Sequence, residues 1–162
     1  MGDPAGVGPE VLLKSYKKAR GTQNLVAISD FDKIKYLAER FNLPVRKINH
    51  IDEAKNFKDE LNILNIKYPA DFIPGKFDYK NAKSVIESIR IATELCMEKK
   101  VDAMVTGPIN KSILNSCQEF KFSGHTDYLE FLCGCEKDTA TMMMLNRYLK
   151  IIPLTIHEPL NQ

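Results

Sequence analysis

Apolar residues along this chain alternate between a period of about 2 and a period of about 3.6, and this alternation limits the possible folds more than any other feature. The helical period is clearest in residues 81–100, where one apolar face is formed by Val85, Ile89, Ala92 and Cys96. A strand is expected directly afterwards, at residues 101–105, followed by the loop 106–108 and a helix from Asn110. Because this succession is the unit of a parallel sheet, the sequence predicts an α/β fold whose parallel or mixed sheet is flanked by helices.

The first half of the chain shows the same alternation. Short strands are expected at residues 25–29, 45–51 and 63–68. Asp30 or Asp32 is expected to cap a helix that ends near residues 42–44, because Pro44 disfavours helical geometry in the residue before it.

Two apolar runs near the end of the chain, residues 139–145 and 149–156, are joined by Asn146 and Arg147. This arrangement is consistent with a β-hairpin. The three consecutive residues Met142, Met143 and Met144 are interpreted as strand core.

Charge and composition exclude several classes of protein. The 162 residues include 23 Lys and Arg against 21 Asp and Glu, and the lysines are interleaved with acids, which argues against a nucleic-acid surface. No apolar run approaches the roughly 20 residues of a membrane span, and the N-terminus lacks the pattern of a secretory signal. A cytoplasmic protein with reduced thiols is therefore expected, the cysteines being Cys96, Cys117, Cys133 and Cys135.

Residues 2–9 form a loop rich in glycine and proline, and Pro9 suits the first turn of the helix that follows. Gly6 and Gly8 do not make a dinucleotide fingerprint, because Val11 occupies the position of the third glycine. The loop is interpreted either as simple turn chemistry or as a tight loop that meets an anion or a neighbouring loop. Such loops normally follow a buried strand, so the sequence is expected to be part of a longer protein.

Lys111 lies about one helical turn beyond the expected strand 101–105, where α/β enzymes place their chemistry. Its ammonium group is a candidate for contact with a substrate anion or, if desolvated, for proton transfer. An ordinary surface lysine is the alternative interpretation.

Three other positions are candidates for binding. His125 and Thr126 lie at the expected start of a helix, where free amides favour a phosphate or carboxylate, although either Ser123 or Thr126 also suits a helix cap. His157 follows an apolar run and is a candidate metal ligand or acid/base group, or else a core histidine. Cys133 and Cys135 are separated by one residue, which is too close for the usual zinc spacing and predicts thiols in a helix-end turn.

Four segments, taken together and in order, resemble the 4-hydroxythreonine-4-phosphate dehydrogenase family of vitamin B6 biosynthesis. They are GDPAGVGPE at residues 2–10, VTGPINK at 105–111, GHTDYL at 124–129 and TIHEPL at 155–160. The resemblance implies a fold like that of isocitrate and isopropylmalate dehydrogenases, incomplete in this chain. Residues 1–162 would then be the N-terminal portion of a longer two-domain dehydrogenase.

The resemblance also implies a chemistry. Members oxidise 4-phosphohydroxy-L-threonine with NAD or NADP and a divalent metal such as Zn, Mg or Co, and decarboxylation then gives 3-amino-2-oxopropyl phosphate. The family pattern assigns substrate binding to His125 and Thr126 and metal binding to His157, and it leaves Lys111 as a candidate for substrate or proton contact.

The family site is built across a homodimer, and a catalytic metal typically needs about three protein ligands. We therefore expect the 162-residue chain alone to lack dehydrogenase activity. Two alternatives remain open at this point: a related dehydrogenase acting on threonate or erythronate 4-phosphate, and a non-catalytic phosphate-binding fragment.

Overall fold

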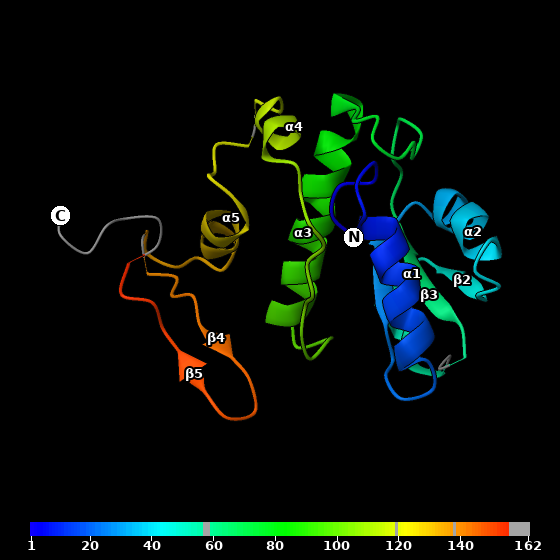
Figure 1. The fold of residues 1–162 in the computed structure, drawn as a ribbon, viewed down its shortest axis with the longest axis horizontal. Helices are drawn as coiled ribbons and strands as arrows, with labels where there is room; N and C mark the ends of the chain where they lie inside the picture. The colour runs from blue at the N-terminus through cyan, green and yellow to red at the C-terminus, as the bar shows by residue number, and fades with distance from the viewer. Residues whose placement is uncertain (57–58, 119, 138, 156–162) are drawn as a thin grey trace. The chain divides into compact units, whose positions relative to one another are not determined.

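The computed structural model describes residues 1–56, 59–118, 120–137 and 139–155 (Figure 1). Its chain divides into two compact units, Met1–Phe122 and Ser123–Gln162, and each is described here by itself. No helix in the described ranges combines the length and the apolar character needed to cross a membrane.

A three-stranded parallel sheet organises the first unit. Its strands are β1 (Val26–Ser29), β2 (Val45–Ile48) and β3 (Leu61–Asn65), in the order β1-β3-β2. Ile28 of β1 and Ile48 of β2 both pair with Leu64 of the central strand, so the three strands are in register across the sheet. The predicted parallel sheet is confirmed for this unit.

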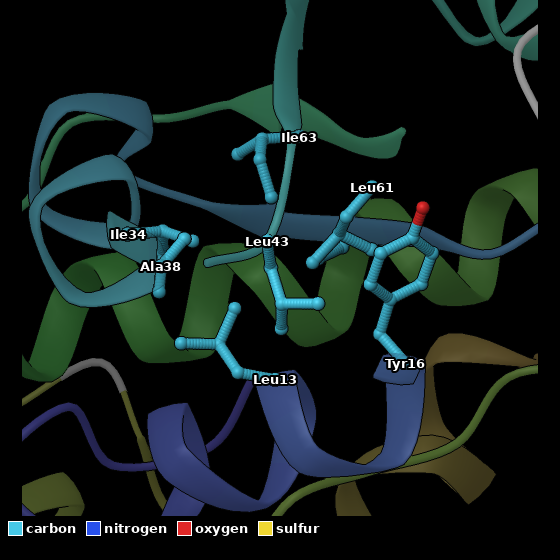
Figure 2. Packing of buried hydrophobic residues seen from close by; sticks show 8 residues of the cluster. Leu13, Tyr16, Ile34, Ala38, Leu43, Leu61 and Ile63 are labelled. Atoms are coloured by element: carbon cyan, nitrogen blue, oxygen red, sulfur yellow. The ribbon is translucent and has the colours of Figure 1, made fainter. Parts of the chain in front are cut away.

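Helices cover both faces of this sheet. The first face packs against α1 (Gly8–Ala19) and α2 (Phe31–Glu39), as Figure 2 shows. The cluster between them is Leu13, Tyr16, Ala27, Ile34, Ala38, Leu43, Leu61 and Ile63. The second face packs against α3 (Ala82–Met97), whose Ala92 and Leu95 lie against a cluster that includes Ile28. Side chains of successive strand residues therefore enter two separate cores, as a sheet buried on both faces requires.

Local chemistry sets the helix boundaries much as the sequence predicts. Asp30, rather than Asp32, caps α2, and its carboxylate accepts a hydrogen bond from the Asp32 amide at 3.1 Å. Pro9 lies in the first turn of α1, where its missing amide hydrogen costs nothing. The helix predicted from Asn110 is α4 (Lys111–Asn115), and the predicted helix 81–100 corresponds to α3.

Two predicted strands have different limits. The strand expected at 45–51 ends at Ile48, and a 3-10 helix, η1 (Ile51–Asn56), follows it. The strand expected at 63–68 lies instead at Leu61–Asn65. It stops there because the Tyr68 amide bonds to the Asp30 carboxylate at 3.2 Å, which takes the chain out of the sheet. A second 3-10 helix, η2 (Tyr79–Asn81), leads into α3.

The strand predicted at residues 101–105 is wrong. This stretch has a bend at Val101 and Asp102 and no regular secondary structure after it, and none of the described strands pairs with it. Its apolar residues are not a buried run either, since Val105 is 91% exposed. A strand exists only with a hydrogen-bonded neighbour, and the chain just beyond this stretch contacts the N-terminal residues instead.

The second unit contains α5 (His125–Leu132) and a hairpin of β4 (Met144–Leu145) and β5 (Lys150–Ile151). The predicted hairpin is confirmed, and the Asn146 side chain holds its turn by accepting hydrogen bonds from the Tyr148 and Leu149 amides. The strands are much shorter than the predicted apolar runs.

The interpretation of the methionines as strand core is wrong. Met142, Met143 and Met144 are between 42% and 52% exposed, and both described strands of the hairpin are exposed. The reason is that β4 and β5 form a two-stranded sheet with no third strand among the described residues.

Candidate functional site

The glycine-rich N-terminal loop meets the loop at residues 106–108 beside the carboxyl edge of the parallel sheet. The Asp3 amide donates to the Pro108 carbonyl at 2.8 Å. A Cβ on Gly107 would lie 2.0 Å from the Met1 carbonyl oxygen, and one on Gly2 would lie 2.4 Å from the Pro108 oxygen. Only glycine permits this approach of two backbones. Of the alternatives for the N-terminal loop, the structure shows contact with a neighbouring loop.

Asp3 is a buried acid in this loop that the sequence analysis did not single out. Its carboxylate accepts a hydrogen bond from the Ala5 amide at 2.9 Å, and its backbone carbonyl accepts one from Gly6 at 3.2 Å. Burial raises the pKa of the Asp3 carboxyl above its ordinary value, although the backbone hydrogen bonds oppose the shift. The sequence signal for this hydrogen bond was the position of Asp3 in a turn rich in glycine and proline. In such turns an Asp carboxylate commonly accepts a hydrogen bond from the backbone amide two residues further on.

A second polar cluster lies where β1 and β3 end. Asp30 is almost fully buried and joins the start of α2 to the Tyr68 amide. The Lys33 ammonium donates to the carbonyls of Tyr68, at 2.7 Å, and Ala70, and lies 5.2 Å from the centre of the Phe72 ring. These contacts tie residues 68–72 to α2, so Asp30 and Lys33 have structural partners for their charges.

Lys111 is the first residue of α4 and is exposed. The side chain of Asn110 caps this helix by accepting hydrogen bonds from the Ser112 and Ile113 amides, and Leu114 anchors it in the interior. Lys111 therefore begins a helix three residues beyond Pro108, which contacts the N-terminal loop. This geometry leaves its ammonium group accessible to a ligand, and the role of Lys111 stays a prediction.

His125 and Thr126 begin α5, as predicted for a helix start. Neither Ser123 nor Thr126 caps this helix; Gly124 is the cap residue, and Asp127 accepts hydrogen bonds from the Ser123 hydroxyl and amide instead. Thr126 is exposed, whereas His125 is half-buried and its Nε2 has no hydrogen-bond partner in the structure. Burial lowers the pKa of His125, which favours the neutral imidazole.

The metal ligand predicted at His157 lies outside the described residues. Within the described ranges, no group of three or more His, Cys, Asp or Glu side chains is placed to hold a metal ion. Lys111 belongs to the first unit, and His125 and Thr126 belong to the second. The position of each side chain is therefore described relative to its own unit only.

The cysteines match the predicted thiols. None of Cys96, Cys117, Cys133 and Cys135 forms a disulfide in the described part of the chain. Cys133 is the C-cap residue directly after α5, and Cys135 follows Gly134 in the turn, as expected for a helix-end turn.

Comparison with known proteins identifies related chains. The family described as "Pyridoxal phosphate biosynthetic protein PdxA" matches residues 21–162. The 4-hydroxythreonine-4-phosphate dehydrogenase of Maricaulis maris is 34% identical over 99% of this chain and 50% of its own length. That of Saccharophagus degradans is 32% identical over 98% of this chain and 47% of its own.

Solved structures show the same relationship to 4-hydroxythreonine-4-phosphate dehydrogenases. The 4-hydroxythreonine-4-phosphate dehydrogenase of Klebsiella pneumoniae superposes with a TM-score of 0.85 at 28% identity, covering 99% of this chain and 50% of that one. The enzyme from Burkholderia phymatum gives 0.83 at 28% identity, covering 98% and 49%. The chain thus spans about half the length of its relatives. Its α/β unit and its match across residues 21–162 show that it belongs to the PdxA family of pyridoxal phosphate biosynthetic proteins.

Proposed function

We propose that this chain forms the N-terminal portion of a two-domain 4-hydroxythreonine-4-phosphate dehydrogenase with an isocitrate dehydrogenase-like fold. The reaction is the NAD- or NADP-dependent oxidation of 4-phosphohydroxy-L-threonine, followed by decarboxylation to 3-amino-2-oxopropyl phosphate, in the synthesis of pyridoxal phosphate. The observation that carries the proposal is the family match over residues 21–162, together with relatives that bear this enzyme's name.

His125 and Thr126 are proposed to bind the phosphorylated substrate. The Nε2 atom of His125, which has no hydrogen-bond partner in the structure, supports this. A polar atom shielded from water gains more binding free energy from a hydrogen bond to a ligand than a polar atom that water already solvates. The hydroxyl of Thr126 lies beside it at the start of α5, where free backbone amides favour an anionic group.

Lys111 is proposed to contact an anionic group of the substrate or to take part in proton transfer. Its exposed position at the start of α4 supports this role. A flexible ammonium group is a compact positive charge, well suited to a carboxylate or phosphate.

The reaction is proposed to need a divalent cation, with His157 as one ligand. The described part of the chain contains no cluster of three metal-binding side chains, so on its own it does not fit a catalytic metal. Further ligands have to come from residues outside that part, and we expect the 162-residue chain alone to be inactive.

A homodimer and a cytoplasmic location are also proposed. The exposed apolar side chains of the hairpin support a contact between subunits, because surfaces of this kind mark interaction sites. Within the hairpin they include Leu145, Tyr148 and Leu149, and Met142, Ile152 and Leu154 flank it. Four cysteines that form no disulfide support a reducing compartment.

Reconstitution tests the function. The chain is mixed with the separately expressed C-terminal half of the Klebsiella pneumoniae relative, and reduction of NAD or NADP is followed with 4-phosphohydroxy-L-threonine. We expect turnover that chelation of divalent cations abolishes. Turnover on threonate or erythronate 4-phosphate alone would point to the related dehydrogenases. Substrate binding without turnover would contradict the proposed enzyme and favour a phosphate-binding fragment.

A further inference from the structure

Two thiols flank a single glycine in the turn that ends α5. The Gly134 amide donates a hydrogen bond to the Phe131 carbonyl at 3.1 Å. The Cys135 amide donates to the Glu130 carbonyl, also at 3.1 Å. Gly134 itself is left-handed, with a φ of 68°. Together these features define a Schellman motif, so the backbone that carries Cys133 and Cys135 has one set conformation.

This conformation suits a bond between the two sulfurs. A residue in the left-handed region holds the Cα atoms on either side of it roughly 5.5 Å apart, within the range of about 4.4–6.8 Å that a disulfide requires. Glycine adopts this conformation without steric cost. A disulfide between Cys133 and Cys135 therefore needs rotation of the two side chains and no movement of the backbone.

The two thiols differ in exposure. Cys135 is exposed and Cys133 is partly buried, and neither forms a disulfide in the described part of the chain. A redox-sensitive cysteine is typically accessible to solvent and lies beside a second thiol that resolves the first adduct. In this pair, Cys135 has the position of the attacking thiol and Cys133 that of the resolving thiol.

A metal site does not account for the pair. A structural zinc ion takes four ligands, and within the described ranges no third His, Cys, Asp or Glu side chain is placed to join the two cysteines. The acid in the same motif, Glu130, accepts hydrogen bonds through its carboxylate from the Thr139 and Ala140 amides, each at 2.7 Å. The two thiols are therefore best placed to react with each other.

We propose that Cys133 and Cys135 form a dithiol redox site that a small-molecule disulfide converts reversibly into an internal disulfide. The Cys135 thiolate attacks one sulfur of the small disulfide, whose S–S bond breaks and releases one thiolate. The Cys133 thiolate then attacks the Cys135 sulfur of the mixed disulfide and displaces the second thiolate. The two cysteines lose two electrons and two protons, which the two released small thiols carry away.

A reducing compartment is consistent with such a site. Disulfides that form there in proteins are usually transient or redox-sensing, and an exposed disulfide is readily reduced. The pair would rest as thiols and respond to a rise in the ratio of small disulfide to small thiol.

Equilibration of the 162-residue chain with reduced and oxidised glutathione tests this. Remaining thiols are trapped by alkylation, and peptide mass spectrometry gives the state of each cysteine. We expect an internal disulfide between Cys133 and Cys135, with an effective concentration at least about tenfold higher in the folded chain than in urea. Cys133→Ser is expected to stop at a glutathione mixed disulfide on Cys135. Cys117→Ser removes another partly buried thiol as the control and is expected to behave like the parent chain.

A stable mixed disulfide on Cys135 in the parent chain, with Cys133 still open to alkylation, would overturn the proposal. Equal effective concentrations in the folded chain and in urea would also overturn it, because the pairing would then owe nothing to the turn.

A Gly134→Val variant sharpens the test. A Cβ at this position would meet nothing within 4 Å, so the substitution acts through the backbone rather than through crowding. Valine strongly disfavours the left-handed conformation and is expected to lower the effective concentration at least about threefold. An unchanged value would show that the Schellman motif does not set the geometry of the pair, contrary to the proposal.

Discussion

The two units contain apolar segments of similar composition, yet they bury them very differently. In the first unit, four of the five residues of β3 are buried, and helices cover both faces of the sheet. In the second, the strands of the hairpin are exposed along both β4 and β5. The difference in burial comes from whether helices pack on the strands, rather than from the residue types within the strands. An apolar run becomes core only where a second element packs on it, and otherwise remains a surface for a partner.

The largest expected effect comes from removing the same side chain in each unit. Ile63→Ala in the central strand is expected to lower the free energy of unfolding by about 2–5 kcal/mol, because it leaves a cavity in a fully buried site. Ile151→Ala in β5 is the matched control and is expected to change it by less than about 0.5 kcal/mol. Urea unfolding measures both. Similar losses would mean that the hairpin is buried as deeply as the sheet.

A smaller loss is expected from crowding the contact between the two loops of the first unit. Gly107→Ala would place a methyl group against the Met1 backbone and is expected to cost about 1–3 kcal/mol. Gly6→Ala is the control in the same region, since its Cβ would meet the Asp3 carbonyl at an ordinary 3.5 Å. Thermal unfolding compares the two variants, and equal melting temperatures would show that the loops do not pack as described.

A charge on the hairpin tests whether its exposed apolar surface binds another subunit. Leu145→Glu is expected to weaken self-association at least about tenfold, because a charge would be buried in the contact. Tyr36→Glu places the same charge at an exposed apolar position on α2 of the first unit, as a control. Sedimentation velocity gives the dissociation constants. If Tyr36→Glu weakens association as much as Leu145→Glu, the contact does not involve the hairpin specifically.

The smallest effect concerns the buried acid of the N-terminal loop. Because burial raises the pKa of Asp3, the folded chain holds this proton more tightly than the unfolded one. The resulting stabilisation is complete below the ordinary pKa of 3.8 and is lost as the pH rises through the raised value. Asp3→Asn stays neutral, so its stability relative to the parent chain should improve from about pH 3.5 to about pH 7.

The exposed Asp102→Asn is the control for that measurement, which uses urea unfolding at each pH. A gain of less than about 1 kcal/mol is expected for Asp3→Asn and a smaller one for Asp102→Asn. A relative loss for Asp3→Asn with rising pH would contradict the raised pKa.

Features that depend on neighbours in the sequence could be predicted well. The cap of α2, predicted at Asp30 or Asp32 and found at Asp30, follows from local hydrogen bonding. The same holds for the helix starts near Pro9 and Asn110, the turn at Asn146 and the thiols near the end of α5.

Features that depend on residues distant in the sequence could not be predicted. The expected strand at residues 101–105 needed a neighbouring strand, and the methionines at 142–144 needed a covering layer; neither requirement can be read from local periodicity. Asp3 was missed for the same reason, since its burial depends on contacts with residues more than a hundred positions away. The local sequence placed His125 and Thr126 at a helix start, which the structure confirms, whereas their role in substrate binding was implied only by the resemblance.

Binding of 4-phosphohydroxy-L-threonine to the 162-residue chain, measured by isothermal titration calorimetry, tests the central claim most directly. The chain is compared with His125→Ala and with His50→Ala, in which the exposed histidine after β2 is removed. We predict that His125→Ala weakens binding by about tenfold or more and that His50→Ala leaves it unchanged. Equal affinity in all three proteins would contradict the assignment of substrate binding to the start of α5.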